Sequence, residues 1–464
     1  MRCEGCMGSF PLRSVGIVRG KKLKGFVATM AEQTRGYASA EVGTDTNGSH
    51  PLSRLNRNVA SLQPSKTGFM ADLAMTLKEE GKDIISLAAG EPDFDTPEPV
   101  SSAGIEAIKM GLTRYTKMTG TTELKQAISK KLKDENGLEY GVDSIVVSNG
   151  AKQSVWQALM ATCGEGDEVL IPAPFWVSYP EMARLAGAIP KVLETTAKTG
   201  YILTPQYLES ALTPKSRLLV LCSPSNPTGA VYTRAELEAL AEVVRKHPQL
   251  MVLADEIYEY IIYPPAQHHS FAALPGMFDR TITVNGFSKG FAMTGWRMGY
   301  AAAPVHFATA MASIQSHCTS GPSSISQHAA LAALSMGPRG GEPVGKMVKE
   351  FHKRRDMVIS KLQDIEGVEV ETPGGAFYAL PDVSAFFGEG VSAEKFGPIP
   401  DGDALCRYII QKAEVALVPG SAFGSPQTLR MSYATSMEKL EEALSRISKA
   451  LEAIKKSPPG AQQI

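Results

Sequence analysis

The sequence lacks a strong charge of either sign and has no long apolar run. Its 464 residues include 47 Lys and Arg against 48 Asp and Glu, a formal net charge of -1. Proteins that bind nucleic acid or anionic membranes through their overall charge carry a clear basic excess. No uninterrupted apolar segment reaches the roughly 20 residues that cross a bilayer. We therefore expect a soluble mature protein, with no nucleic-acid or membrane partner.

Cysteine is scarce, and motifs for metal binding are missing. The 6 Cys are too few for a disulfide framework in a chain of this size, which indicates a reducing compartment. Cys3 and Cys6 have C-x-x-C spacing but lie in a leader without secondary-structure signals, so we assign them no redox or metal role. No H-E-x-x-H occurs, and His268 and His269 lie in a proline-rich loop, so we predict no metal site.

Two segments resemble nucleotide-binding motifs without meeting their requirements. Residues 250–256 (LMVLADE) look like a Walker B strand, and residues 340–347 (GGEPVGKM) are one residue short of a Walker A loop. Met347 stands where magnesium binding needs Ser or Thr, and no strand precedes the loop. The sequence therefore argues against an ATPase.

The first fifty residues differ in composition from the rest. Before residue 40, basic side chains outnumber acidic ones, and small and hydroxylated residues follow. A basic, acid-poor, serine-containing leader is typical of an organelle transit peptide, which is how we interpret residues 1–50. A disordered basic tail is the alternative. Residues 35–39 (RGYAS) would also suit a mitochondrial processing site.

Beyond the leader, short apolar segments alternate with amphipathic ones. The spacing of apolar residues predicts helices over residues 123–135, 151–163 and 234–246. Strands are predicted over residues 145–148, 168–171, 217–222, 250–254 and 280–284. Continuous apolar strands alternating with helices favour a mostly parallel sheet covered on both faces. The predicted class is therefore α/β.

The pattern changes near residue 342. A long charged helix runs through residue 362, short strands follow, and a terminal amphipathic helix spans residues 437–455. We predict a large domain over residues 93–345 and a smaller α/β domain over residues 346–456. Residues 51–92 would form an N-terminal arm and part of the small domain, and residues 457–464 a disordered tail.

Unusual side chains follow three of the predicted strands. Asn226 comes after one strand in a stiff Pro-rich turn, Asp255 and Tyr258 after the next, and Lys289 after a third. Ligands of open α/β sheets bind beyond the carboxyl ends of the strands. Alone, Asn226 suits a turn and Asp255 a helix cap. Together, an amide, a carboxylate, a phenol and a lysine that can form a Schiff base match the needs of pyridoxal phosphate.

Other candidates complete such a site. Residues 148–153 (SNGAKQ) place a glycine at a helix start, where free N–H groups can bind phosphate, or form only a turn. Arg297 could grip the phosphate bidentately, and Tyr115 could add a hydroxyl. Trp176 could stack on a flat ring or pack in a core. Arg430, in a short strand-like segment, could hold a substrate carboxylate or expose its head.

These motifs resemble the fold-type I pyridoxal-phosphate-dependent aminotransferases, subgroup Ib of the aspartate aminotransferases. Within that group the sequence looks most like the plastid aspartate/prephenate aminotransferases. The resemblance covers residues 55–451, and its segments are residues 88–97 (AAGEPDFDTP), 148–153, 223–229 (SPSNPTG), 255–258 (DEIY), 285–297 and 430–435 (RMSYAT). It implies a large domain with a mostly parallel seven-stranded sheet flanked by helices, and a smaller α/β domain.

The resemblance implies a role for each candidate. Lys289 is the Schiff-base lysine and proton shuttle, Asp255 pairs with the pyridine nitrogen, Asn226 and Tyr258 bind the O3′ oxygen, and Trp176 stacks on the ring. The remaining cofactor-binding residues are Gly150, Ala151, Lys152, Ser288, Arg297 and, reaching the neighbouring subunit, Tyr115. Substrate-binding residues are Gly90, Thr67, Lys152, Trp176, Asn226 and Arg430. The sequence departs from the family at Phe175, where Tyr is common, and at Gly286, where a phosphate-binding Ser is frequent.

The implied reaction is transamination between dicarboxylic amino acids and oxo acids, prephenate among the acceptors, in a plastid homodimer with shared active sites. Arg430 would take one carboxylate of the substrate as a fork and Lys152 the other as a point charge. Alternatives are an aspartate aminotransferase without prephenate activity, an alanine- or kynurenine-type aminotransferase, a β-eliminating enzyme, a non-catalytic cofactor-binding regulator, and a mitochondrial location.

Overall fold

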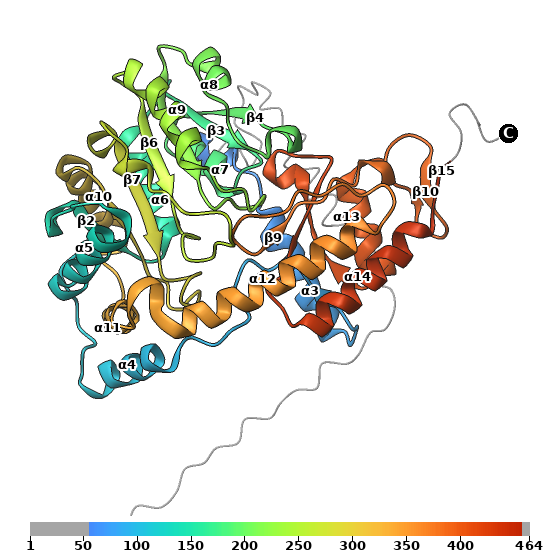
Figure 1. The fold of residues 1–464 in the computed structure, drawn as a ribbon, viewed down its shortest axis with the longest axis horizontal. Helices are drawn as coiled ribbons and strands as arrows, with labels where there is room; N and C mark the ends of the chain where they lie inside the picture. The colour runs from blue at the N-terminus through green and yellow to red at the C-terminus, as the bar shows by residue number, and fades with distance from the viewer. Residues whose placement is uncertain (1–54, 457–464) are drawn as a thin grey trace, which may run out of the picture. The chain divides into compact units, whose positions relative to one another are not determined.

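The computed structural model describes residues 55–456. These residues belong to two units, and the boundary between the units in the sequence lies between Pro64 and Ser65. Of the first unit the structure describes residues 55–64, which include the short helix α2 (Arg57–Ala60). The second, which begins at Ser65, contains all the other elements described below (Figure 1). The leader and the tail lie outside the described residues. Among the described helices, none combines the length and apolarity needed to span a bilayer.

A mixed seven-stranded sheet dominates the second unit. Its order is β2-β8-β7-β6-β5-β3-β4. Its strands are β2 (Ile145–Ser148), β3 (Glu168–Ala173), β4 (Ile189–Glu194), β5 (Ser216–Cys222), β6 (Met251–Asp255), β7 (Thr281–Gly286) and β8 (Gly299–Ala302). All neighbours pair in parallel except β8, which is antiparallel to both β2 and β7. The predicted mostly parallel sheet is confirmed.

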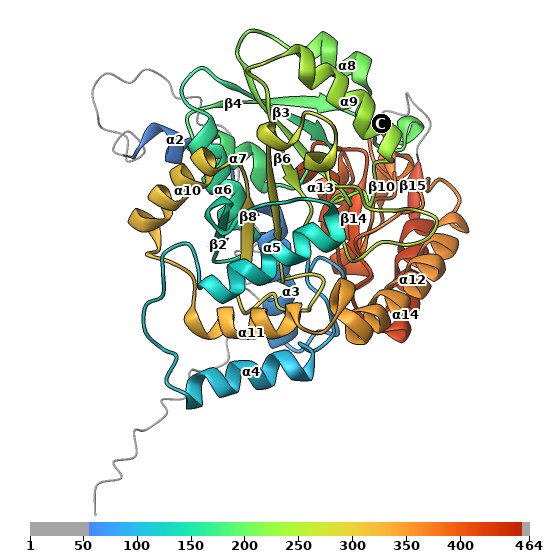
Figure 2. The ribbon, with the colours of Figure 1, turned by 60° about the vertical axis from the view of Figure 1, so that its left-hand side comes forward.

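Helices cover both faces of this sheet (Figure 2). One face packs on α6 (Ala151–Thr162), α7 (Ser178–Leu185) and α10 (Val305–Cys318). The other packs on α8 (Pro205–Ala211), α9 (Arg234–Lys246), α5 (Thr122–Asn136) and α11 (Ser324–Leu334). Residues of one strand alternate between these cores, as Leu218 and Leu219 do. Two buried faces explain why the strands are apolar throughout.

Local signals set several helix ends. Gly137 ends α5 in the left-handed conformation at φ 69°, which glycine adopts without a Cβ penalty. A capping box of Thr233 and Glu236 begins α9, whose range matches the prediction. Two further helices are α3 (Lys66–Glu79), which packs on the short strands near residues 415–419, and α4 (Glu98–Lys109), which packs on α11.

The chain after residue 340 builds smaller sheets and longer helices. The helices are α12 (Gly341–Gln363), α13 (Gly402–Lys412) and α14 (Met437–Glu452), and α12 packs against α14 (Figure 1). The short strands are β9 (Tyr378–Ala379), β10 (Val391–Ala393), β11 (Gly397–Pro398), β12 (Val415–Ala416), β13 (Val418–Pro419), β14 (Leu429–Ser432) and β15 (Ile454–Lys456), and β1 (Ile85–Ser86) joins them from earlier in the chain. β9, β13 and β14 form one sheet, and β1 pairs with β12. The predicted domain boundary near residue 345 falls inside α12, and the division remains a prediction.

One predicted element was too long. The terminal helix ends at Glu452, not at Lys455, because residues 454–456 form β15 and pair antiparallel with β10. Amphipathic periodicity does not report a pairing with a strand about sixty residues earlier, so the sequence pattern extended the helix through it.

Candidate active site

The strand ends bring the predicted residues to one edge of the sheet. β5, β6 and β7 run in parallel, with Cys222 opposite Asp255 and Asp255 opposite Val284. Asn226 and Lys289 follow the ends of β5 and β7 within a few residues. The expectation that these groups meet at the carboxyl edge is therefore confirmed.

Asp255 is a buried carboxyl group that forms no ion pair with any described residue, although the charge of Lys289 acts on it. It is 5% exposed, accepts a hydrogen bond from the Tyr179 hydroxyl at 2.6 Å, and accepts one from the Ile257 N–H at 3.2 Å. Burial raises the pKa of Asp255 to about 6. A carboxylate held in so apolar a place is stabilised by any cationic N–H that enters the site.

Lys289 places its amine at the same edge. Its Nζ donates to the backbone oxygen of Gly90 and lies 5.8 Å from the centre of the Tyr258 ring. Burial, helped by the positive charge of Arg430, lowers the pKa of Lys289 to about 8. A lysine with this pKa has a substantial neutral fraction near pH 8 and can act as a nucleophile or base.

Arg430, on β14, is fully buried and forms no ion pair with any described carboxylate. It is 2% exposed; its Nη1 donates to Asn226 Oδ1 at 3.1 Å and its Nη2 to the Ala88 oxygen at 2.7 Å, while Nε has no partner. Burial lowers its pKa. A buried guanidinium with a donor to spare suits an incoming carboxylate.

Two tyrosines that no sequence pattern indicated join this group. Tyr179, on α7, partners Asp255. Tyr378, on β9, has its hydroxyl 2.8 Å from that of Tyr258, and its ring centre lies 4.6 Å from the Arg430 guanidinium carbon. Strand alternation does not separate such a tyrosine from a core residue. Tyr378 could be recognised as a site residue only from its position on the strand that pairs with the strand of Arg430, and that pairing is known only from the structure.

The residues predicted to hold a phosphate come together at the start of α6. Gly150 precedes the helix at φ 83°, and a Cβ built on it would lie 2.5 Å from Nη2 of Arg297. Both the conformation and the close approach require glycine. Ala151 and Lys152 are the first two residues of α6, so free helix N–H groups and the Arg297 guanidinium converge. Ser288 is buried beside Lys289.

Lys152 also lies close to the aromatic ring of Trp176. Its Nζ lies 5.0 Å from the centre of the Trp176 ring, and Trp176 contacts Tyr179 edge to face at 5.2 Å. Partial burial, with the charge of Arg297 adding to it, lowers the pKa of Lys152. Trp176 thus stands between the Asp255–Tyr179 pair and a cation.

The structure places the remaining predicted residues in different ways. Gly90 contacts Lys289 through its oxygen. Thr67, in the first turn of α3, has a buried Oγ1 without a hydrogen-bond partner. Tyr115 is 96% exposed and makes no contact with the other site residues. Gly286 has Gly299 Cα and Met298 O each 2.9 Å from a built Cβ, so a serine there would need the backbone to shift.

Two other groupings are not part of the predicted site, and the first of them begins at Glu256, the residue after Asp255. Glu256, Glu259 and His268 come together, with His268 Nε2 3.1 Å from Glu256 Oε2, a meeting that the sequence did not predict. Glu259 already accepts hydrogen bonds from Lys131, Asn136 and Asn285, and no metal is assigned there.

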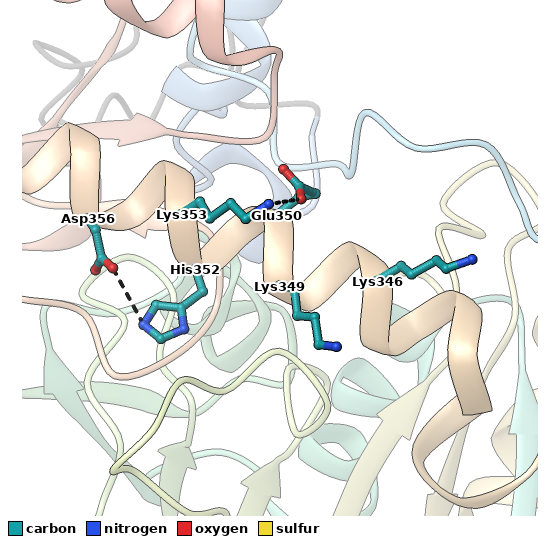
Figure 3. Close-up of a pocket in the computed structure, with 6 residues that line it drawn as sticks. All are labelled: Lys346, Lys349, Glu350, His352, Lys353 and Asp356. Atoms are coloured by element: carbon teal, nitrogen blue, oxygen red, sulfur yellow. Dashed lines mark hydrogen bonds and ion pairs between the residues drawn. The ribbon is translucent and has the colours of Figure 1, made fainter.

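A hollow on α12 is lined by Lys346, Lys349, Glu350, His352, Lys353 and Asp356 (Figure 3). Lys346 and Lys353 form ion pairs with glutamates of the same helix. The residues that line the hollow include no buried group that could carry out chemistry.

Comparison with known proteins decides the family. The family described as aminotransferase class I and II matches residues 82–447. The chain belongs to the class I and II aminotransferases. These are transaminases that depend on pyridoxal phosphate, so the predicted enzyme class and cofactor are confirmed.

Curated relatives agree with this membership. A bifunctional aspartate aminotransferase and glutamate/aspartate-prephenate aminotransferase of Petunia hybrida is 58% identical over 405 residues, 87% of this chain and 84% of the relative. An aspartate aminotransferase of Pinus pinaster is 56% identical over 398 residues, 86% of this chain and 80% of the relative.

Solved structures of aminotransferases share the fold. The aspartate aminotransferase of Rhizobium meliloti matches with a TM-score of 0.82 and 42% identity, covering 87% of this chain and 100% of that one. The Thermus thermophilus aspartate aminotransferase with maleate matches with a TM-score of 0.80 and 38% identity, covering 85% and 99%. The fold-type I architecture is therefore confirmed.

The residues present fit the cofactor of this family. Among the described residues Asp255 and Arg430 form no ion pair, Arg430 Nε has no partner, and Gly150 leaves beside Arg297 a cradle that a Cβ would fill. A pyridine N–H would pair with Asp255, a substrate carboxylate with Arg430, and a phosphate would fit beside Gly150.

Proposed function

We propose that this aminotransferase exchanges amino groups between dicarboxylic substrates. Aspartate and glutamate would be donors, and oxaloacetate, 2-oxoglutarate and prephenate acceptors, with prephenate giving arogenate on the route to phenylalanine and tyrosine. The observation that carries this proposal is a pair of cations, Arg430 and Lys152, neither of which forms an ion pair with a described carboxylate.

The names of the relatives support this substrate class. The Petunia relative carries both aspartate and prephenate activities in its name, and a Cereibacter sphaeroides relative that is 46% identical is named aspartate/prephenate aminotransferase. The Pinus relative is named aspartate aminotransferase alone. Aspartate transamination without prephenate activity is therefore the second candidate.

Several residues would hold the cofactor. Asp255 would hold the pyridine nitrogen, Asn226 and Tyr258 the ring oxygen, and Trp176 the ring face. The phosphate would be held by Gly150, Ala151, Lys152, Ser288, Arg297 and the partner subunit's copy of Tyr115. When bound, pyridoxal phosphate acts as an electron sink that makes the α-proton of an amino acid acidic.

The chain's own groups then divide the work. Arg430 orients the substrate through its α-carboxylate, helped by the backbone at Gly90, and Lys152 with Thr67 positions the distal end. Lys289 accepts the α-proton at Nζ, which requires a neutral amine, and its pKa of about 8 meets that need near neutral to mildly basic pH. The Asp255 carboxylate holds its position through Tyr179.

A homodimer with shared sites would complete the enzyme. Tyr115 is 96% exposed, and apolar side chains on α4 and after it are also exposed. These are Ile105, Ile108, Met110, Leu112 and Met118. So many exposed apolar residues close in sequence suit a protein interface. Tyr115 would then reach the phosphate of the partner's site.

We further propose a plastid location, with residues 1–50 as the transit peptide. The basic, acid-poor leader and the Petunia relative support it. A mitochondrial matrix location is the alternative. We propose separately that the chain divides into a large domain over residues 93–345 and a small domain over residues 346–456.

Specificity constants test the proposed substrates. The mature protein with its cofactor would be assayed with glutamate or aspartate against prephenate, oxaloacetate and 2-oxoglutarate, and with alanine and pyruvate as the monocarboxylic pair. High kcat/KM for prephenate supports the bifunctional enzyme, and activity restricted to oxaloacetate and 2-oxoglutarate supports the second candidate. A preference for alanine and pyruvate would refute the dicarboxylic assignment.

A further inference from the structure

Tyr378 connects the two halves of the site, the group that would bind substrate and the group that would bind cofactor. It lies on β9, which pairs antiparallel with β14, where Arg430 stands. Its side chain is 1% exposed. The ring faces the Arg430 guanidinium, and the hydroxyl meets that of Tyr258.

The ring forms one side of a clamp on Arg430. The guanidinium carbon lies 4.6 Å from the centre of the Tyr378 ring and 4.9 Å from that of Phe423. Contact with an aromatic face stabilises a desolvated guanidinium and limits its rotation. The plane in which Arg430 can offer its donors to a carboxylate is thereby set by two aromatic rings.

The hydroxyl of Tyr378 sets the direction of a hydrogen bond. It lies 2.8 Å from the Tyr258 hydroxyl, and either oxygen can donate. Each hydroxyl has a single proton. When Tyr378 donates, the proton of Tyr258 is free for an acceptor in the site. An anionic oxygen beside Tyr258 selects that arrangement, because it needs a donor.

The backbone of residues 88–90 is built around the same hydroxyl. Ala88 O accepts from Arg430, and Gly90 O accepts from Lys289. A Cβ built on Gly90 would lie 2.9 Å from the Tyr378 hydroxyl oxygen but 3.9 Å from the ring carbon that bears it. The hydroxyl, and not the ring, therefore excludes a side chain at residue 90.

We propose that Tyr378 is a positioning residue with two separable actions: its ring orients Arg430 toward a dicarboxylate, and its hydroxyl directs the Tyr258 proton into the cofactor site. This rests on the proposed function. If the wild-type protein takes up no pyridoxal phosphate, or binds no dicarboxylate, the proposed function fails first.

Two substitutions in the cofactor-loaded full chain separate the actions. Tyr378→Phe keeps the ring and removes the hydroxyl. Donation from Tyr378 to the Tyr258 oxygen polarises the Tyr258 O–H group, so Tyr258 becomes a stronger donor to an anionic oxygen in the site. We therefore expect the pH midpoint of the cofactor's visible absorbance to rise by about half a pH unit or more. The dissociation constant for maleate, a non-reacting dicarboxylate, should stay within about twofold.

Tyr378→Leu removes the ring as well. The loss of its contact with Arg430 should weaken maleate binding by about tenfold or more. Tyr263→Phe is the matched control, because Tyr263 is also buried, faces Arg355 at 5.0 Å and contacts another tyrosine hydroxyl, that of Tyr433. It should change neither the absorbance midpoint nor maleate affinity.

A double-mutant cycle provides a test that does not depend on Tyr378→Leu folding. Gly90→Ala should shift the absorbance midpoint in the wild type, where the new Cβ meets the hydroxyl, and should add little in Tyr378→Phe, where it does not. Additive shifts would overturn the role of the hydroxyl. Unchanged maleate affinity in a folded Tyr378→Leu protein would overturn the role of the ring. If Tyr263→Phe changed the absorbance midpoint and the maleate affinity as much as the Tyr378 substitutions do, both effects would reflect a general loss of stability and the proposal would fail.

Discussion

At the scale of single residues, the site consists of charged groups whose partners are absent from the protein itself. Asp255 and Arg430 are both buried, and neither forms an ion pair with a described residue. Lys289 is held with a lowered pKa between them. Such arrangements reduce stability and are kept where function needs them.

Asp255→Asn should therefore stabilise the cofactor-free protein. The rise of the Asp255 pKa from 3.8 to about 6 corresponds to about 3 kcal/mol of unfolding free energy lost at pH 7. The folded state keeps the proton longer than the unfolded state, so stability falls as pH rises between about 4 and 6 and stays low above. Asn carries no charge to desolvate and can still accept from Tyr179.

Urea unfolding at pH 4 and pH 7 measures this. We expect the gain in unfolding free energy to be larger at pH 7, and turnover to be lost. The exposed Asp364, at the end of α12, supplies the control, because Asp364→Asn should change stability by less than about 0.5 kcal/mol. An Asp255→Asn protein no more stable than the wild type at pH 7 contradicts this account.

The sequence was sufficient to predict the residues that follow strand ends. Asn226, Asp255 and Lys289 lie within a few positions of apolar segments, and parallel strands bring those positions to one edge. Tyr378 and Tyr179 could not be predicted this way. Their partners lie 120 and 76 residues away, and a buried tyrosine has no local pattern that separates it from core.

At the scale of elements, the phosphate seat depends on close contact between β8 and the start of α6. A Cβ built on Gly299 would lie 2.2 Å from the Ala151 nitrogen and 2.6 Å from the Gly150 carbonyl carbon. The helix can therefore begin where it does only because β8 has no side chain there. β8 and β4 were not among the predicted strands, since GYAA is weakly apolar and IPKVLE is half polar.

Gly299→Ala should push the start of α6 away from β8. We expect cofactor affinity to fall by about tenfold or more, and unfolding free energy to fall by about 1–3 kcal/mol, as overpacking does. Cofactor titration by fluorescence and urea unfolding measure both. Gly141→Ala is the control, because its φ of -70° suits any residue and a Cβ there meets nothing within 4 Å. If Gly299→Ala binds cofactor like the wild type, this contact does not set the seat.

At the scale of the whole molecule, the exposed apolar face of α4 supports the proposed dimer. Ile105 and Ile108 are 54% and 58% exposed, and Tyr115 follows them on the same stretch of chain. The dimer and the domain division both remain predictions, because both depend on contacts between surfaces whose partners are not encoded locally.

Ile108→Lys should dissociate the dimer. A lysine in an apolar interface loses hydration without a partner, which costs several kcal/mol. We expect a monomer at micromolar concentration in sedimentation velocity, with cofactor affinity reduced because Tyr115 no longer reaches the second site. Ile189→Lys is the control: Ile189 is 50% exposed on β4, at the other end of the sheet. An active Ile108→Lys monomer with wild-type cofactor affinity would rule out shared sites.

The central claim is that two cations, Arg430 and Lys152, select a substrate with two carboxylates. The most direct test compares Lys152→Ala with the wild type, both saturated with pyridoxal phosphate, in kcat/KM for aspartate and for alanine. Loss of one charge-assisted contact should lower the value for aspartate by about 10- to 100-fold and leave that for alanine within about threefold. Equal losses on both amino acids would contradict the claim.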